Sequence, residues 1–254
     1  LLGITIKLNS TKLCALIIWL NIRKIKIIKS NSNKPKNILV FPKTGGYEDL
    51  VESYRNKNDN NLNFYVLPRF FLKKIFSHYF EKKYKRDYFT KAININKKNK
   101  KKEYINFLIR TFFSLEKFIK IDGFISFNIF YYAEKHLEEV FRILKKKYVI
   151  LHKESTFTPI EELNAERMYK KYNEKSLAFR ISVYSENQKK ILINSKIAVK
   201  KQIYVNGCPR SDYAFGLRKI KPKKNIIVYY LLEKRRGSNL ILSKVNINWT
   251  KLYY

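Results

Sequence analysis

Short apolar runs alternate with amphipathic segments along most of this chain. The runs are rich in β-branched and aromatic residues, which is typical of strands buried on both faces of a parallel sheet. They occupy residues 37–41, 63–67, 123–127, 148–151, 180–184 and 202–205. Strands that alternate with helices at this spacing predict βαβ units. We therefore expect an α/β fold, a Rossmann-like parallel sheet with helices on both faces.

The segments between these strands carry apolar residues at the three-and-four spacing of a helix with one buried face. We expect helices at residues 47–55, 69–80, 103–119, 131–147, 159–172 and 186–194. The basic stretch 87–102 has little apolar pattern and is expected to form a loop or an exposed surface. Leu13–Leu20 (LCALIIWL) is apolar but shorter than the ~20 residues of a membrane span. A core or docking helix is the favoured interpretation, with an interfacial helix or a damaged signal peptide as alternatives.

The order of these elements predicts three parts. Residues 1–36 form an N-terminal apolar and basic segment, and residues 37–218 form the Rossmann-like domain. A basic, proline-containing stretch then leads into another apolar run, Asn225–Leu232, which predicts the start of a second α/β domain in residues 219–254. Because the chain begins at Leu1 rather than at Met, we expect a fragment or a processed product.

The chain is strongly basic, with 54 Lys and Arg against 20 Asp and Glu, a net charge of +34. Codon bias is the favoured explanation, because the basic residues are spread along the chain and the dominant residue types have AT-rich codons. An anionic membrane or phosphate-rich partner is the next interpretation. We expect no specific nucleic-acid recognition, because the sequence contains no zinc-finger spacing, RNP octamer or basic zipper. Two cysteines and three scattered histidines give no reason to expect a zinc site.

Residues that directly follow the strands are the candidates for function, because right-handed crossovers bring the carboxyl ends of parallel strands to one edge. Gly45 and Gly46 follow the first strand, where they would let a backbone approach a phosphate or sugar. His152 and Glu154 follow the fourth strand and could supply a general base. The structural alternatives are a tight turn for the two glycines and a surface loop for His152 and Glu154. Ser185, after the fifth strand, is expected to cap a helix.

The string after the sixth strand, Asn206–Tyr213 (NGCPRSDY), is the most specific in the chain. Gly207 permits a sharp turn, and Arg210 and Asp212 can pair with each other or cap the next segment. A purely structural turn accounts for the string equally well.

These strings resemble the two-domain GT-B glycosyltransferases, in particular bacterial proteins of surface-carbohydrate (capsule or lipopolysaccharide) biosynthesis. The residues that carry the resemblance are Ile203–Tyr213 (IYVNGCPRSDY), His152–Glu154 (HKE) and Phe41–Asp49 (FPKTGGYED). The resemblance implies a cytoplasmic glycosyltransferase that moves a sugar from a nucleotide-sugar donor to a surface-polysaccharide or lipid-linked acceptor. It implies no metal and no other cofactor, and it is compatible with peripheral association with an anionic inner membrane.

The resemblance also implies roles for residues. Gly45, Gly46, Gly207, Arg210 and Asp212 would border the substrate-binding cleft. A base in this half of the protein would deprotonate the acceptor, and the candidates in order are Glu154, His152, Glu48 and Asp49. The donor-binding helix of the second domain is missing from the sequence, so the chain as it stands could be inactive.

Three alternatives stay open at this point. The same fold serves nucleotide-sugar 2-epimerases and polyol-phosphate transferases. Few carboxylates follow the strands, which counts against an epimerase. The third alternative is a non-catalytic basic protein that binds nucleic acid or membrane. A steep loss of binding affinity as the salt concentration rises would distinguish it.

Overall fold

The structure is a computed structural model that describes residues 1–25, 33–43, 45–55, 61–80, 95–153, 159–172 and 175–209. The chain divides into two compact units, Leu1–Phe215 and Gly216–Tyr254, and every described residue lies in the first. The expected strand Asn225–Leu232 lies outside the described residues. The fold below is therefore that of the first unit.

The described residues form a seven-stranded sheet in the order β1-β3-β2-β4-β5-β6-β7. The strands are β1 (Arg23–Lys24), β2 (Lys36–Val40), β3 (Leu62–Val66), β4 (Gly123–Ser126), β5 (Lys147–Leu151), β6 (Arg180–Val183) and β7 (Ile203–Val205). Neighbouring strands from β3 to β7 are parallel, and of the described strands only the short edge strand β1 runs antiparallel, with Arg23 opposite Val66. The expected parallel α/β sheet is confirmed, with each of its six predicted strands placed to within one residue.

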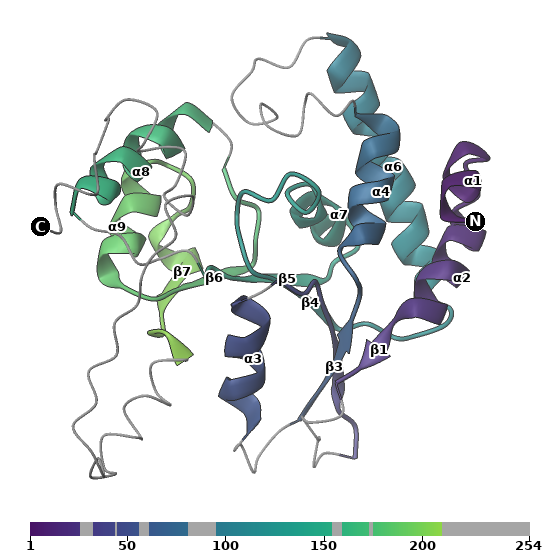
Figure 1. The fold of residues 1–254 in the computed structure, drawn as a ribbon, viewed down its shortest axis with the longest axis horizontal. Coiled ribbons are helices and arrows are strands. Elements are labelled where there is room, and N and C mark those ends of the chain that lie inside the picture. Colours follow the sequence, from purple (N-terminus) through teal and green to yellow (C-terminus); the bar gives the residue numbers. More distant parts are fainter. Residues whose placement is uncertain are drawn as a thin grey trace, which may run out of the picture. The chain divides into compact units, whose positions relative to one another are not determined.

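The described helices cover the two faces of this sheet unequally (Figure 1). They are α1 (Leu2–Lys7), α2 (Thr11–Asn21), α3 (Gly46–Arg55), α4 (Phe70–Tyr79), α6 (Ile95–Leu115), α7 (Leu137–Ile143), α8 (Pro159–Tyr172) and α9 (Glu186–Asn194). Among the described helices, only α3 lies on one face, which we call the α3 face; the others pack on the opposite face.

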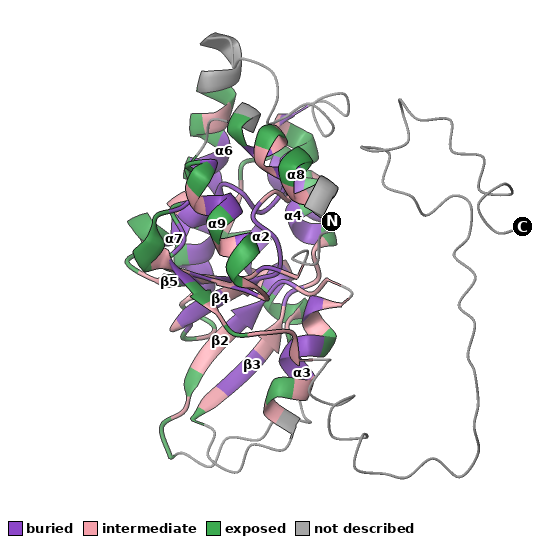
Figure 2. Ribbon diagram, turned by 90° about the vertical axis from the view of Figure 1, so that its left-hand side faces the viewer, coloured by how far each residue is buried: buried purple, intermediate pink, exposed green. Residues whose placement is uncertain are grey.

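Connection handedness explains this imbalance. α3 links β2 to β3, which lies on one side of β2, whereas every later crossover moves in the other direction along the sheet. Right-handed crossovers in opposite directions put their helices on opposite faces. As a result Ile38, Ile125, Val149 and Leu151, which point to the α3 face, are only partly buried. Figure 2 shows stretches of intermediate burial along β2 and β3.

The main core lies on the opposite face and is built around aromatic rings. Phe141 from α7 stacks on Phe124 of β4 and Phe41, and it meets Phe112 of α6 edge-on. Phe41, Phe112 and Phe141 are each at most 1% exposed. Apolar burial of this kind is the main favourable term in folding, and aromatic pairs add to it.

Two helix predictions were wrong at their boundaries. α6 begins at Ile95, inside the basic stretch that was expected to be a loop. Lysine is a good helix former, and solvent-facing turns need no apolar residues. α7 covers only Leu137–Ile143 of the expected 131–147, because residues 131–136 form turns and Lys145 takes a left-handed conformation (φ 56°) that ends the helix.

The N-terminal segment belongs to the same packed unit. α2 contains the apolar run Leu13–Leu20, and its Cys14, Ala15 and Ile18 are fully buried in the main core, which confirms the core-helix interpretation. β1 then joins the sheet beside β3, a strand that the sequence pattern did not predict. Within the described part of the chain, no helix combines the length and apolar character needed to cross a bilayer.

His136 provides a test of the core. It precedes α7, is 3% exposed and lies edge-on to the ring of Tyr104. Burial lowers the pKa of His136 well below its usual value, and Lys101 and Lys135 act in the same direction. Below about pH 6.5 this histidine is protonated in the unfolded chain but stays neutral in the folded protein. The free energy of unfolding should therefore fall by about 1–2 kcal/mol as the pH drops from 6.5 towards 5.

Urea denaturation across this pH range measures that loss. His136→Asn should remove this part of the pH dependence, whereas His78→Gln, which changes an exposed histidine on α4, should leave it intact. An unchanged slope in His136→Asn would contradict the assignment.

Candidate functional site

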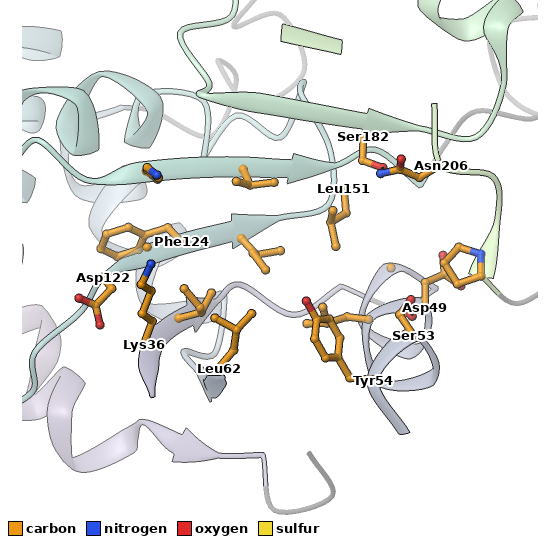
Figure 3. A pocket seen from close by; sticks show the side chains of 18 of the residues that line it. Lys36, Asp49, Ser53, Tyr54, Leu62, Asp122, Phe124, Leu151, Ser182 and Asn206 are labelled. Atoms are coloured by element: carbon orange, nitrogen blue, oxygen red, sulfur yellow. Dashed lines mark hydrogen bonds between the residues drawn. The ribbon is translucent and has the colours of Figure 1, made fainter. Parts of the chain in front are cut away.

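A groove of about 730 Å³ runs along the α3 face. Its floor is apolar and includes Ile38, Ile125, Val149 and Leu151, and α3 forms one wall. Figure 3 shows that its two ends differ: Lys36 and Asp122 lie at the amino end of the strands, and Asp49, Ser182 and Asn206 lie at the carboxyl end. β2 borders the point where the connections change direction, which is where ligands bind in open α/β sheets.

Asp49 and Tyr184 meet at the carboxyl end of the groove. Asp49 lies in the first turn of α3 and is 5% exposed, and Tyr184 directly follows β6. The Tyr184 hydroxyl donates a hydrogen bond to Oδ2 of Asp49, although the two residues are 135 positions apart. The first turn of a helix favours a carboxylate, because the backbone N–H groups there carry partial positive charge. The pair therefore holds an oriented carboxylate at the groove.

A second polar pair completes this end. Asn206 Nδ2 donates to Oγ of Ser182 at 3.0 Å, and both residues line the groove. Ser182 and Tyr184 are two positions apart, so they project to the same face. Hydroxyl, amide and carboxylate groups above an apolar floor can together bind a polyhydroxylated ligand.

Gly45 directly precedes α3 and Gly46 begins it, and contacts within the protein explain why each position is a glycine. Gly45 has φ 87°, a conformation that glycine adopts readily, and its N–H donates to Oε2 of Glu48. A Cβ on Gly46 would lie 2.8 Å from Cβ of Phe127 and closer still to the ring. Gly46 also lines the groove, whereas Gly45 is not among its lining residues. Because Glu48 occupies the Gly45 N–H and the first turn of α3 carries two carboxylates, Glu48 and Asp49, this helix start is poorly suited to a phosphate.

His152 lies away from the groove. Its side chain is fully buried, and its ring lies edge-on to Phe130, which packs against the main core on the opposite face. The His152 N–H donates to the Ser182 carbonyl at 2.8 Å and so extends the pairing of β5 and β6. A fully buried imidazole cannot touch a substrate in this conformation. Glu154, the other expected base, lies outside the described residues.

Gly207 also lines the carboxyl end of the groove. It has φ 72°, and nothing lies within 4 Å of the position that a Cβ would take. The glycine is thus required by its backbone conformation rather than by crowding. Arg210 and Asp212, the other residues expected here, lie outside the described residues. Ser185 is the predicted helix cap: its Oγ accepts from the N–H of Gln188 at 3.2 Å, so the capping interpretation is confirmed.

The groove contains residues that sequence reasoning missed. Ser182 and Tyr184 were not singled out, although each stands at or just after a strand end, where polar residues could have been noticed; Asn206 was noticed only as part of the string Asn206–Tyr213. Lys36, Lys145 and Lys147 make the amino end of the groove basic, and this end was not considered. Asp122 lies among them, and its Oδ2 accepts from the N–H of Asn37 at 2.8 Å.

A buried ion pair fixes the loops at the carboxyl edge on the opposite face. Arg69 Nε donates to Oε1 of Glu134, and the Ser126 hydroxyl donates to Oε2 of the same carboxylate. The Arg69 guanidinium also lies 4.2 Å from the centre of the Tyr131 ring. Burial raises the pKa of Glu134, while Arg69 and Ser126 act against that rise. The pair ties together the segments that follow β3 and β4.

Among the residues that the structure describes, no three His, Cys, Asp or Glu side chains are grouped so that they could hold a metal ion. Comparison with protein-family models, with curated proteins and with solved structures gives no match for this chain.

Proposed function

We propose that this domain binds the acceptor of a glycosyltransferase, with Asp49 as the base. The observation that carries the proposal is the Asp49–Tyr184 pair, which lines the carboxyl end of a groove with an apolar floor and holds a nearly buried carboxylate there. Sugars have hydroxyls at their edges and apolar C–H faces. The polar groups at the carboxyl end of the groove suit the hydroxyls, and its apolar floor suits the C–H faces. The resemblance of the sequence to GT-B enzymes supports a glycosyltransferase by analogy.

The proposed reaction joins an acceptor hydroxyl to the anomeric carbon of a nucleotide sugar. Asp49 takes the proton of the hydroxyl as its oxygen bonds to that carbon, and the bond from the carbon to the phosphate oxygen breaks. The nucleoside diphosphate leaves with the bonding electrons. The Tyr184 hydroxyl holds the carboxylate in position and keeps one of its oxygens engaged. Asp49 thereby takes the role for which Glu154 and His152 were first considered.

The amino end of the groove suggests the class of acceptor. Lys36, Lys145 and Lys147 could pair with a phosphate while the hydroxyl to be glycosylated reaches towards Asp49. A lipid-linked sugar phosphate combines these features, whereas a neutral saccharide would use only the carboxyl end.

Asp49→Asn tests the proposal. Binding of methyl glycosides of hexoses and N-acetylhexosamines to the full chain is measured by saturation-transfer NMR. We expect the variant to bind the recognised glycoside about tenfold more weakly, because a hydrogen bond to a charged group contributes about 1.5–3 kcal/mol. Glu186→Gln is the matched control, since Glu186 also lies in the first turn of a helix that follows a strand but does not line the groove.

Two results would count against the proposal. If both variants bind the glycosides as the parent protein does, Asp49 does not contact the acceptor. If glycerol phosphate binds and the glycosides do not, a polyol-phosphate transferase becomes the better description.

A further inference from the structure

Large apolar side chains are exposed on and just after α1, α2 and α6. These helices lie near the β1 edge of the sheet (Figure 1). We call this set of side chains the hairpin surface. Its members are each at least 40% exposed, and they are Leu8, Leu13, Trp19, Leu20, Phe113 and Phe118. α2 is thus apolar on both sides: Cys14, Ala15 and Ile18 face the core, and Leu13 and Leu20 face outwards. A helix that is apolar all round is normally covered on all sides.

Contacts between the three helices support a continuous surface. Leu13 and Leu20 are seven residues apart, so they share one side of α2. The ring of Trp19 stacks on that of Phe118 with centres 5.3 Å apart. Arg110 of α6 donates to Oδ1 of Asn9, in the turn between α1 and α2, at 3.2 Å, and Phe113 lies one helical turn after Arg110.

Basic side chains outnumber acidic ones around this surface. Exposed basic side chains flank the apolar residues along the chain: Lys7, Lys12, Arg23, Lys24, Lys117 and Lys120. The first acidic residue in the chain is Glu48, so neither α1, α2 nor β1 contributes a negative charge. Two acidic residues lie near the end of α6: Glu116 is paired with Lys146, and Asp122 with Lys120, whose side chain is 81% exposed.

We propose that the hairpin surface binds an anionic lipid membrane. Apolar side chains would enter the boundary between headgroups and acyl chains, and the surrounding cations would attract acidic lipids. Tryptophan is favoured at that boundary because its ring is amphipathic. This proposal does not depend on the proposed enzymatic activity, since it concerns a surface outside the groove.

Two other occupants fit the chemistry less well. A second copy docked symmetrically would bring the same cations against each other. A nucleic acid would gain stacking from Trp19 and the phenylalanines, but the leucines can neither stack on bases nor hydrogen-bond to them.

Tryptophan fluorescence of the full chain tests the proposal directly. The chain has two tryptophans, so Trp249→Phe leaves Trp19 as the only one. We expect its emission to shift to shorter wavelength with vesicles of phosphatidylglycerol and phosphatidylcholine, and not with phosphatidylcholine alone. In co-sedimentation with the same vesicles, Leu13→Asn/Leu20→Asn should lower the partition coefficient at least tenfold, given ~25 cal/mol per Å² of apolar area.

Leu163→Asn on α8 is the matched control, because Leu163 is 61% exposed and Leu20 67% exposed. It should sediment with the vesicles as the parent does. Equal sedimentation of the hairpin variant, or an unshifted Trp19 emission, would overturn the proposal. The proposal would also be overturned if the parent protein is a dimer and the hairpin variant is a monomer, because a second copy of the chain would then cover the hairpin surface.

Discussion

Replacement of Glu134 by methionine should lower the free energy of unfolding by about 3–5 kcal/mol, as measured by urea denaturation. Glu134 is 1% exposed, and its two oxygens accept from Arg69 and Ser126. Its removal leaves a guanidinium that is only 14% exposed without its carboxylate. Since this pair joins the segments after β3 and β4, the loss should fall on the whole cooperative unit.

The double variant Arg69→Met/Glu134→Met distinguishes the ion pair from simple loss of packing. Burial raises the pKa of Glu134 despite the nearby guanidinium, which indicates that desolvation offsets much of the attraction. Removal of both charges should therefore recover at least half of the stability lost in the single variant. If the double variant is less stable than the single one, the charges themselves contribute net stability and this reasoning is wrong.

Replacement of Gly46 by alanine should cost about 2–3 kcal/mol, because the added methyl group collides with Phe127. Phe127 is fully buried between β4 and α3, so its ring has little room to move. The start of α3 would have to shift, and Asp49 would move with it. We expect weaker glycoside binding as well as a lower midpoint of urea unfolding.

Gly3→Ala is the control for this substitution. Gly3 lies within α1, and the nearest atom to an added Cβ is Lys74 Cε at 3.6 Å. Alanine there should be neutral or should stabilise the protein by about 0.5–1 kcal/mol, as usual for a helix interior. If Gly46→Ala is as stable as Gly3→Ala, the close approach of α3 to Phe127 is not maintained in solution, and Gly46 is better interpreted as a ligand-binding residue.

The sequence predicted the strands of the sheet well and the helices less well. Each apolar run is short and bounded by polar residues, so its position is determined locally, and the six runs became β2–β7. α7 was expected to be longer because Ala133 and Leu137 fit a helical stripe. In the fold, the Arg69–Glu134 pair and the turns of residues 131–136 hold this segment instead. Arg69 is 65 residues away, a distance over which local patterns carry no information.

The candidate site was predicted in part. Its location at the carboxyl edge follows from parallel strands and right-handed crossovers, so the sequence alone determined that Asp49, Gly46 and Gly207 would lie at this edge. Which of these residues share the groove was decided only by the tertiary structure. His152 follows its strand as expected, yet it belongs to the face that the later helices cover, and its ring is buried there.

The local pattern of apolar residues thus determined the fold class and the strand positions, and the serine before the expected helix determined the cap of α9. The tertiary structure decided that Asp49 meets Tyr184, that Gly46 is held against Phe127, and that α2 has an uncovered outer side. The physical reason is the same in each case. Periodicity reports whether a side chain will be buried, whereas the identity of its neighbour depends on the order of strands and the direction of crossovers, which bring together residues far apart in the chain.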